Sequence, residues 1–379
     1  MKLQENFDAI IIGAGINGCG IAAELSRAGN SVVILERGAI GSGTSSKSSR
    51  LIHGGLRYLE TAKISLVREA LRDRMELLSL YPDLVQIKPF YLPLYQSSPR
   101  PPWMIGTGLK LYDLLSGKYS EYKSHRISTD EFLDHAPSLS PENLKAAFCY
   151  YDGKTDDLEL TRRVAAEAHQ NGAIIHEHIK IREIISDQSS HLIKTNRGEF
   201  TSRVLINSTG PWIDEVNQQF DLPTNYHIRK ISGIHIVIDG LLTNDLMFMQ
   251  TAGKRIFFII PEPENDRTII GTTEREESIA CDEVSYDDSD IQYLLDSIND
   301  YLIPQRQLAV NDVKDVWIGI RPLIAKKNNP TDLSREYALD RHQSGSTTLI
   351  HVFGGKLTTF LSLARKTYRL LGNRLPLRR

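Results

Sequence analysis

Short apolar runs alternate with amphipathic segments at the start of the chain, as in parallel strands joined by helices. Residues 9–12 and 32–35 are continuous apolar runs of the kind that form buried strands. Between them, helical spacing runs from about Gly18 to Ala28, and Gly29 ends it. Further helices are predicted at residues 64–80, 103–115, 161–171 and 287–302. This pattern predicts an α/β fold at the amino-terminal end.

The pattern changes in the middle of the chain. Residues 231–238 alternate between apolar and polar positions, which indicates a strand with one buried face. More short strand-like runs with turn residues between them follow at 246–251, 255–260 and 268–272. We therefore expect an antiparallel sheet here. Residues 89–102 contain five prolines and are predicted to be a loop.

The α/β pattern also extends to later parts of the chain. Strands are predicted at residues 173–185, 203–207, 317–322 and 349–352, with a final helix from about residue 356. The simplest arrangement is a discontinuous nucleotide-binding domain with a substrate domain inserted as two pieces. The nucleotide-binding domain is expected to comprise residues 1–84, 151–220 and 311–379, and the substrate domain residues 85–150 and 221–310.

A glycine pattern follows the first predicted strand. Gly13, Gly15 and Gly18 fit G-x-G-x-x-G, and Glu36 closes the second strand. In such units the first glycine makes the tight turn, the second lets the backbone approach a pyrophosphate, and the third lets the helix pack on the sheet. The helix N-terminus faces the phosphates, and the acid holds ribose hydroxyls. Because strand, helix and acid are all in place, the sequence predicts a bound adenine dinucleotide, with residues 180–181 near its adenine.

The composition excludes several other classes of protein. The chain has 379 residues, of which 41% are hydrophobic and 24% charged, and its net charge of −2 gives no overall attraction for nucleic acid. No apolar stretch reaches the ~18 residues that span a bilayer. Cys19, Cys149 and Cys281 lie far apart, which favours a reducing, cytoplasmic compartment. His176 and His178 alternate on one strand without a third ligand, so no metal is expected.

Basic residues gather at the carboxyl-terminal end. Residues 365–379 contain six basic residues and no acid, and they overlap an amphipathic helical pattern. Such a helix lies on an anionic membrane surface or packs its apolar face on its own domain. Both interpretations stay open at this point, and with the first the protein is peripheral on the inner face of the cytoplasmic membrane.

A hydroxyl-rich run, SGTSSKSSR, occupies residues 42–50 and can hold a pyrophosphate beside the dinucleotide site. With its continuation, the chain resembles the FAD-dependent glycerol-3-phosphate dehydrogenases of the amino-acid-oxidase-like flavoprotein superfamily. The resemblance rests on SSKSSRLIHGGLRYL at 45–59, NSTGPW at 207–212, SGIHIV at 232–237, GTT at 271–273, GIRPL at 319–323 and VFGGKLTT at 352–359. These motifs run in order across nearly the whole chain.

The resemblance implies an activity. It implies a glutathione-reductase-like, Rossmann-like FAD domain, non-covalent FAD, oxidation of sn-glycerol 3-phosphate to dihydroxyacetone phosphate, and electron transfer to a membrane quinone. Many relatives continue into a helical carboxyl-terminal domain, and this chain stops about twenty residues after FGGKLTT. We therefore expect a short form, to which the functions of that domain are not carried over. A homodimer is a candidate assembly.

Three cations are expected to hold the substrate. Guanidinium groups match phosphate geometry with paired donors, which favours Arg57 and Arg321 as phosphate ligands. Lys356 follows two glycines at a predicted helix N-terminus, where the helix dipole disfavours a cation unless an anion is bound. Arg321 and Lys356 are also candidates for polarising the substrate oxygen or stabilising reduced flavin.

The resemblance also suggests a base and the cofactor contacts. His235 is the candidate base, because its ordinary pKa lies near neutrality, and Tyr58 and Thr272 are candidate hydrogen-bonding partners of the substrate. The expected FAD contacts are Gly13, Gly15, Asn17, Gly18, Glu36, Thr44, Ser45, Ser46, Ser49, Leu51, Thr209, Gly210, Gly354, Gly355, Leu357 and Thr358.

Three other functions remain open from the sequence. An oxidase would pass the electrons to oxygen, and the motifs do not separate it from a quinone-linked dehydrogenase. A related FAD oxidoreductase would act on an amino acid or another hydroxy acid, but three cations favour a phosphate dianion over one carboxylate. A flavin-binding subunit without turnover would not need Arg57, His235, Arg321 and Lys356 together.

Overall fold

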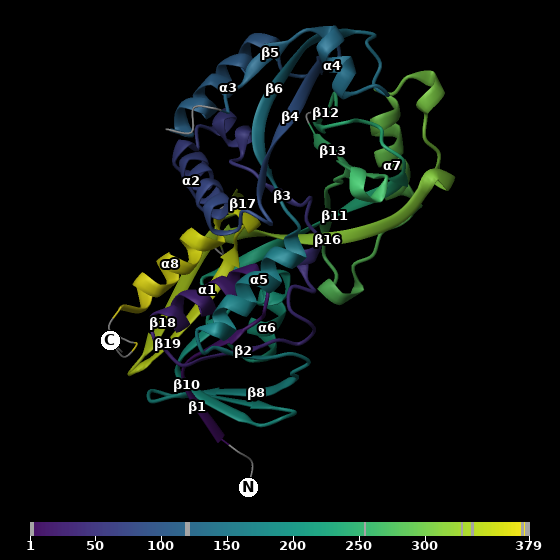
Figure 1. Ribbon diagram of the computed structural model, residues 1–379. Coiled ribbons are helices and arrows are strands. Elements are labelled where there is room, and N and C mark those ends of the chain that lie inside the picture. Colours follow the sequence, from purple (N-terminus) through teal and green to yellow (C-terminus); the bar gives the residue numbers. More distant parts are fainter. Residues whose placement is uncertain are drawn as a thin grey trace.

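The computed structural model describes residues 4–117, 122–253, 255–326, 329–334, 337–372 and 375. These residues form an eight-stranded and an eleven-stranded sheet, with helices packed against both (Figure 1). The helices are α1 (Ile16–Arg27), α2 (Ile64–Leu80), α3 (Pro102–Leu115), α4 (Thr129–His135), α5 (Asp157–Gln170), α6 (Ile213–Gln219), α7 (Asp288–Asn299) and α8 (Phe360–Leu371).

The first sheet is parallel at its centre. Its main path runs β18 (Tyr337–Ser344), β19 (Thr347–Gly354), β10 (Glu199–Asn207), β1 (Gln4–Ile12), β2 (Val32–Leu35) and β7 (Ile174–His176). The strands from β19 to β7 are parallel, whereas β18 is antiparallel to β19. Two further antiparallel strands, β8 (Ile181–Ser186) and β9 (His191–Thr195), extend it beside β10. The apolar run of β1 is fully buried, as the continuous hydrophobic pattern predicts.

The second sheet carries the inserted part of the chain. Its main path runs β17 (Asn329–Ser334), β16 (Val313–Lys326), β11 (Tyr226–Asp239), β14 (Arg267–Gly271), β13 (Ile256–Glu262), β12 (Leu246–Gln250), β4 (Gln86–Tyr95), β6 (Leu144–Lys154) and β3 (Leu51–Ile52). Two short strands, β15 (Arg275–Glu277) and β5 (His125–Ile127), pair with β11 and β6. Helices α4 and α7 share one apolar core with this sheet, and α2 and α3 share another.

Several predicted elements are confirmed. Helix α2 begins and ends where the apolar spacing predicts, and the strands predicted in the middle of the chain pair antiparallel. Helix α5 begins at Asp157, four residues before the predicted start, because the Asp156 carboxylate caps it by accepting from Glu159 N at 2.9 Å. The mixed α/β class with an antiparallel second sheet is therefore correct.

Two predictions are wrong. The proline-rich segment 89–102 is not a loop throughout, because β4 covers residues 86–95 and pairs with β6. Pro89 and Pro93 lie four residues apart, so both missing N–H groups fall on the same edge of the strand and the other edge stays complete. Residues 317–322 do form a strand, but it belongs to the second sheet, antiparallel to β11.

The position of β16 bears on the expected domain boundary at residue 311. Residues 313–326 pair with β11 along almost its whole length, and β17 follows in the same sheet. Residues 337–354 then return to the first sheet. We propose that the last piece of the nucleotide-binding unit begins after β17.

Helix α8 packs on its own domain. Phe360, Leu363 and Leu371 are buried in the core that α1 also enters. On its other face, Arg365 Nη1 lies 2.7 Å from Glu76 Oε2, and Lys366 Nζ lies 2.7 Å from Glu69 Oε2, both on α2. Arg369 is exposed near the end of the helix, and the other three basic residues of the predicted stretch, Arg374, Arg378 and Arg379, lie outside the described residues. Among the described helices, none is long and apolar enough to cross a membrane.

Candidate active site

A cavity of about 1040 Å³ lies between the two sheets. One part of its lining comes from the ends of β1 and β2 and the start of α1, and another from β11, β13 and β16 of the second sheet. The segment 41–58 and the turn after β19 also contribute to the wall. The carboxyl ends of parallel strands therefore face the inserted sheet across one space, the position at which α/β folds bind ligands.

The glycine pattern forms a cradle at one end of this cavity. Gly13 has φ of +100°, and a Cβ there would lie 2.8 Å from Ser208 O. Gly15 is the N-cap of α1 and makes no side-chain cap, and Ile16 N donates to Ser45 Oγ at 3.0 Å. The open turn brings backbone N–H groups and a hydroxyl to the cavity, which suits a pyrophosphate.

Glu36 lies at the same end of the cavity. Its Oε2 accepts from Ala14 N at 2.7 Å and its Oε1 accepts from Gly38 N at 2.6 Å. Each carboxylate oxygen keeps further acceptor capacity for a ligand hydroxyl. Residues 179–181 line the same cavity, and the placement of the adenine near residues 180–181 stays a prediction.

Most of the expected cofactor residues line this cavity. The lining includes Gly13, Gly15, Asn17, Glu36, Thr44, Ser45, Ser49, Leu51, Thr209, Gly210, Gly354, Gly355, Leu357 and Thr358. Gly18 and Ser46 lie outside it. A Cβ at Gly18 would lie 2.0 Å from Gly13 O, so this glycine serves close helix packing. The Ser46 hydroxyl turns away and donates to Gly43 O at 3.2 Å.

Lys356 reaches the cavity from the turn after β19. Gly354 and Gly355 have φ of +70° and +97°, backbone conformations that favour glycine. Lys356 Nζ lies 3.9 Å from the centre of the Tyr58 ring. The ammonium is buried and has no hydrogen-bond partner among the described residues. A buried cation in this state is suited to an anionic ligand.

The two arginines expected at the substrate line the same cavity. Arg57 is half-buried on the short helix Leu56–Thr61, beside Tyr58. Arg321 lies on β16, where its Nη2 donates to Thr272 Oγ1 at 3.1 Å and its Nη1 lies 3.5 Å from Glu274 Oε1. All six residues expected at the substrate thus border one space, the sixth being His235.

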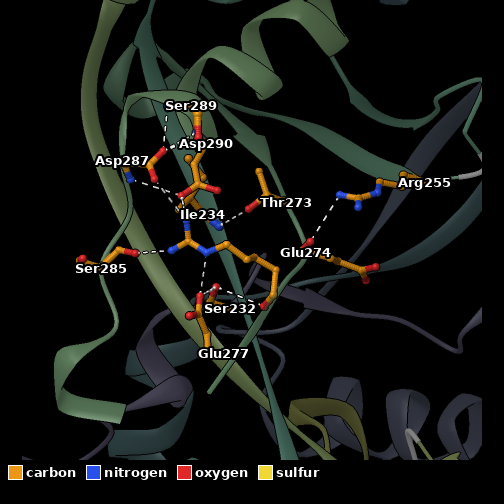
Figure 2. Close-up of polar contacts among 11 residues, drawn as sticks. Ser232, Ile234, Arg255, Thr273, Glu274, Glu277, Ser285, Asp287, Ser289 and Asp290 are labelled. Atoms are coloured by element: carbon orange, nitrogen blue, oxygen red, sulfur yellow. Dashed lines mark hydrogen bonds and ion pairs between the residues drawn. The ribbon is translucent and has the colours of Figure 1, made fainter. Parts of the chain in front are cut away.

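The segment that carries Thr272 and Glu274 is fixed by polar contacts (Figure 2). Ile234 N donates to Thr273 Oγ1 at 3.0 Å, and Arg255 Nη1 donates to Glu274 O at 3.4 Å. Beside them, Arg275 donates to Glu277 Oε1 at 2.9 Å and to Asp290 Oδ2 at 2.7 Å. These contacts tie the turn after β14 to β11 and to the start of α7.

His235 is buried on β11, with 1% of its surface exposed. Its Nε2 lies 2.9 Å from Ser49 Oγ, and its ring stacks on Trp317 with centroids 5.1 Å apart. Burial, followed by the charges of Arg321 and Arg50, lowers the pKa of His235 to about 3. The imidazole is therefore neutral near pH 7 and keeps a lone pair. The expectation of an ordinary pKa near neutrality is wrong, because burial and the two arginines make this imidazole a weaker base than a free histidine. A bound anion that offsets the arginine charges would raise its basicity.

Other lining residues carried no signal in the sequence. Phe90, Tyr150, Phe248 and Phe258 form an aromatic wall contributed by four strands of the second sheet. Asp152 at the end of β6 also borders the cavity. Their roles depend on strand pairing between segments far apart in the chain, which local patterns do not reveal.

The sequence of this chain is similar to those of several known enzymes. The family model described as DAO, FAD dependent oxidoreductase, matches residues 8–362. The chain belongs to the FAD-dependent oxidoreductase family. Within it, the flavoprotein is 37% identical to the aerobic glycerol-3-phosphate dehydrogenase of Escherichia coli over 374 residues, covering 95% of this chain and 72% of that protein. It is 32% identical to the D-erythritol 1-phosphate dehydrogenase of Brucella abortus over 385 residues, covering 99% and 76%.

Solved structures support the same fold for the flavoprotein. The glycerol-3-phosphate dehydrogenase from Bacillus halodurans, complexed with FAD, gives a TM-score of 0.76 at 23% identity, covering 98% of this chain and 66% of that one. The L-α-glycerophosphate oxidase from Mycoplasma pneumoniae, with FAD bound, gives 0.76 at 19% identity, covering 97% and 95%. Glycine oxidase from Geobacillus kaustophilus gives 0.74 at 20% identity, covering 97% and 95%.

The cofactor of the family is FAD, and the residues present fit it. The Gly13–Gly15 cradle has no room for a Cβ at Gly13, and the Glu36 carboxylate borders the cavity with acceptor capacity for ribose hydroxyls. Asn17 Oδ1 at the start of α1 and Lys356 Nζ after β19 are buried polar atoms without partners in the part of the chain that the structure describes. The expected cofactor and family are therefore confirmed.

Proposed function

We propose that this FAD-dependent oxidoreductase oxidises sn-glycerol 3-phosphate to dihydroxyacetone phosphate. The observation that carries the proposal is the convergence of Arg57, Arg321 and Lys356 with the neutral His235 on the cavity that holds the glycine cradle. Cations suit a phosphate dianion, and a neutral imidazole suits an alcohol proton. The similarity to several glycerol-3-phosphate dehydrogenases supports the same substrate.

In this proposal, some residues bind the substrate and another accepts its proton. Arg57, Arg321 and Lys356 bind the phosphate and turn the secondary alcohol toward the cofactor, with Tyr58 and Thr272 donating to substrate oxygens. His235 takes the hydroxyl proton as the C–H bond breaks. FAD, when bound, supplies the acceptor for the hydride. The buried imidazole starts neutral, so no proton has to leave it first.

A phosphate ester fits this site better than an amino acid. Glu274 lies 3.5 Å from Arg321 and also borders the cavity, so the charge of that guanidinium is already shared with a carboxylate. A monoanionic carboxylate would gain less from the remaining cations than a phosphate dianion does. D-erythritol 1-phosphate, the substrate in the name of one relative, has the same phosphate group as sn-glycerol 3-phosphate and a longer polyol. This four-carbon ester is the second candidate substrate.

The test is an anaerobic reduction. FAD-loaded protein is mixed with sn-glycerol 3-phosphate, and the flavin absorbance is followed. We expect rapid bleaching, which glycerol at the same concentration does not produce. If dithionite reduces the flavin and sn-glycerol 3-phosphate does not, the assignment is wrong. Faster bleaching by D-erythritol 1-phosphate would move the assignment to the second candidate.

The proposed electron acceptor is a quinone. The similarity to proteins named as aerobic glycerol-3-phosphate dehydrogenases supports it, whereas the structural likeness to an L-α-glycerophosphate oxidase keeps oxygen as the alternative. Reduced enzyme is mixed with a soluble quinone analogue or with oxygenated buffer. We expect reoxidation by the quinone to be much faster, and rapid peroxide release would instead assign an oxidase.

We also propose that helix α3 contacts the inner face of the cytoplasmic membrane. Trp103 and Leu114 on this helix are 73% and 76% exposed, and exposed Lys110 lies between them in the sequence. Exposed Trp, Leu and Lys on one helix suit peripheral attachment to anionic lipid. Sedimentation with anionic vesicles should fall for Trp103→Ser, and equal sedimentation of both proteins would exclude α3 as the contact.

A further inference from the structure

A buried polar cluster lies beneath the turn that leads into Arg57 and Tyr58. It consists of Arg74 on α2, Tyr112 on α3 and Asp152 on β6, each with 3% or less of its surface exposed. Asp152 Oδ1 accepts from Arg74 Nη1 at 2.6 Å and from Tyr112 Oη at 2.8 Å. Three secondary-structure elements from separate parts of the chain therefore meet at one carboxylate.

This cluster holds the backbone of Gly54. Gly54 N donates to Tyr112 Oη at 2.8 Å and to Asp152 Oδ1 at 3.1 Å. A Cβ at Gly54 would lie 2.4 Å from both Tyr112 Oη and Leu71 Cδ2, so no larger residue fits. The position of this peptide is thus determined by side chains of α2, α3 and β6.

The fixed peptide leads directly into the proposed phosphate site. Gly55 has φ of +79°, and a Cβ there would lie 2.3 Å from the Tyr58 ring. The short helix Leu56–Thr61 follows, and at its far end Glu60 forms an ion pair with the buried Arg100. Arg57 and Tyr58 therefore lie between two tethered ends, with Lys356 over the Tyr58 ring.

A role in stability alone accounts poorly for this cluster. Burying an ion pair costs desolvation that its attraction often fails to recover, so such pairs are weak contributors to stability. Asp152, the acidic member of this pair, borders the cavity. Its hydrogen bonds are directed at one peptide N–H, and a site that binds a phosphate needs its donors held to within a fraction of an ångström.

We propose that Tyr112 and Asp152 are positioning residues that set where Arg57 and Tyr58 meet the substrate phosphate. The inference rests on the proposed function, because it assigns the phosphate to these two residues. Neither Tyr112 nor Asp152 takes part in proton or hydride transfer here. Their loss should therefore weaken binding of the phosphate more than it slows the chemical step.

The experiment compares Tyr112→Phe with Tyr95→Phe. Tyr95 is also a buried tyrosine, and its hydroxyl donates to Ser140 O at 3.0 Å, away from the cavity. Anaerobic flavin reduction is measured against sn-glycerol 3-phosphate concentration, together with the melting temperature of each FAD-loaded protein. We expect Tyr112→Phe to raise the half-saturating concentration about three- to tenfold, the effect of one lost hydrogen bond, with little change in the limiting rate. Tyr95→Phe should change neither value.

A folded Tyr112→Phe protein with the half-saturating concentration of the wild type overturns the inference, as does a fall confined to the limiting rate. Asp152→Asn removes the charge that binds Arg74 and one of the two oxygens facing Tyr112 Oη, so it should shift the concentration in the same direction. Inorganic phosphate separates the two proposals. If the wild-type flavin is not reduced by sn-glycerol 3-phosphate, the proposed function fails. Weaker perturbation of the flavin spectrum by phosphate in Tyr112→Phe would still support the positioning role, and equal perturbation would exclude it.

Discussion

Lys356 Nζ lies 3.9 Å from the centre of the Tyr58 ring, and the ammonium has no hydrogen-bond acceptor among the described residues. An aromatic face stabilises a cation without occupying its hydrogen-bond donors. The three N–H groups of Lys356 thus stay available, while the contact holds the ammonium over Tyr58, the neighbour of Arg57 in the chain. The pair joins the turn after β19 to the short helix Leu56–Thr61 at the point where we place the substrate phosphate.

Replacing Lys356 by alanine should impair the enzyme severely. A lost charge-assisted hydrogen bond corresponds to roughly 100-fold in kcat/KM for sn-glycerol 3-phosphate. The control is Lys366→Ala. Lys366 also lies over a tyrosine ring, at 4.7 Å from that of Tyr337, and it is paired with Glu69. Steady-state kinetics with a quinone analogue should show a near wild-type value for this control, and similar losses in both variants would remove Lys356 from the site.

The Ser49 hydroxyl should matter through His235. It lies 2.9 Å from Nε2 and orients the ring that takes the alcohol proton in our proposal. Ser49→Ala should lower the limiting rate of anaerobic flavin reduction about tenfold. Ser46→Ala is the matched control, since its hydroxyl contacts Gly43 O. A Ser49→Ala protein that keeps the wild-type limiting rate would show that His235 needs no such partner.

Acid should destabilise the protein through His235. Its pKa falls from 6.5 in the unfolded chain to about 3 in the folded protein, so between these values only the unfolded chain binds the proton. The free energy of unfolding therefore falls as the pH is lowered below 6.5, by roughly 1.4 kcal/mol per pH unit.

Urea unfolding of the FAD-loaded protein at pH 7 and pH 5 measures this effect. The loss in free energy of unfolding from pH 7 to pH 5 should be smaller in His235→Gln than in the wild type. It should be unchanged in His125→Gln, because His125 lies exposed on the second sheet. If His235→Gln loses as much stability at pH 5 as the wild type does, the imidazole is not held neutral by the fold.

An exposed contact at the cavity rim should have a small effect on cofactor release. Arg37 pairs with Asp282 through two hydrogen bonds of 2.8 Å, and Trp212 Nε1 donates to the same carboxylate at 2.8 Å. These contacts join the segments after β2 and β10 of the first sheet to the segment after β15 of the second sheet, beside the cofactor cavity. Because exposed ion pairs contribute about 1 kcal/mol or less, Asp282→Asn should speed FAD dissociation by no more than roughly fivefold. Fluorescence of released FAD measures the rate, and a far larger increase would show that this contact controls cofactor retention.

Local patterns predicted much of the fold and of the candidate site. The glycine spacing and Glu36 depend on one strand–helix–strand unit, which local patterns describe well. The residues expected at the substrate lie on separate strands and turns, and only the resemblance linked them before the structure placed them around one cavity. The contact of Ser49 with His235 joins residues 186 positions apart, so no local pattern could show it.

Local patterns also could not predict which sheet a strand joins or which polar groups pair in the interior, because the partners lie far apart in the chain. The run at 317–322 reads as a strand in either sheet, and only its pairing with β11 assigns it. Asp152 ends an ordinary strand, and its role at Gly54 depends on α2 and α3. Gly18, the third glycine of the motif, packs the helix closely against the turn and does not line the cavity.

The decisive experiment is a crystal structure of the FAD-loaded protein with sn-glycerol 3-phosphate. We predict phosphate oxygens within hydrogen-bond distance of Lys356 Nζ and of at least one of Arg57 and Arg321, with the secondary hydroxyl at His235. Phosphate bound elsewhere, with these cations contacting only protein groups, would contradict the account.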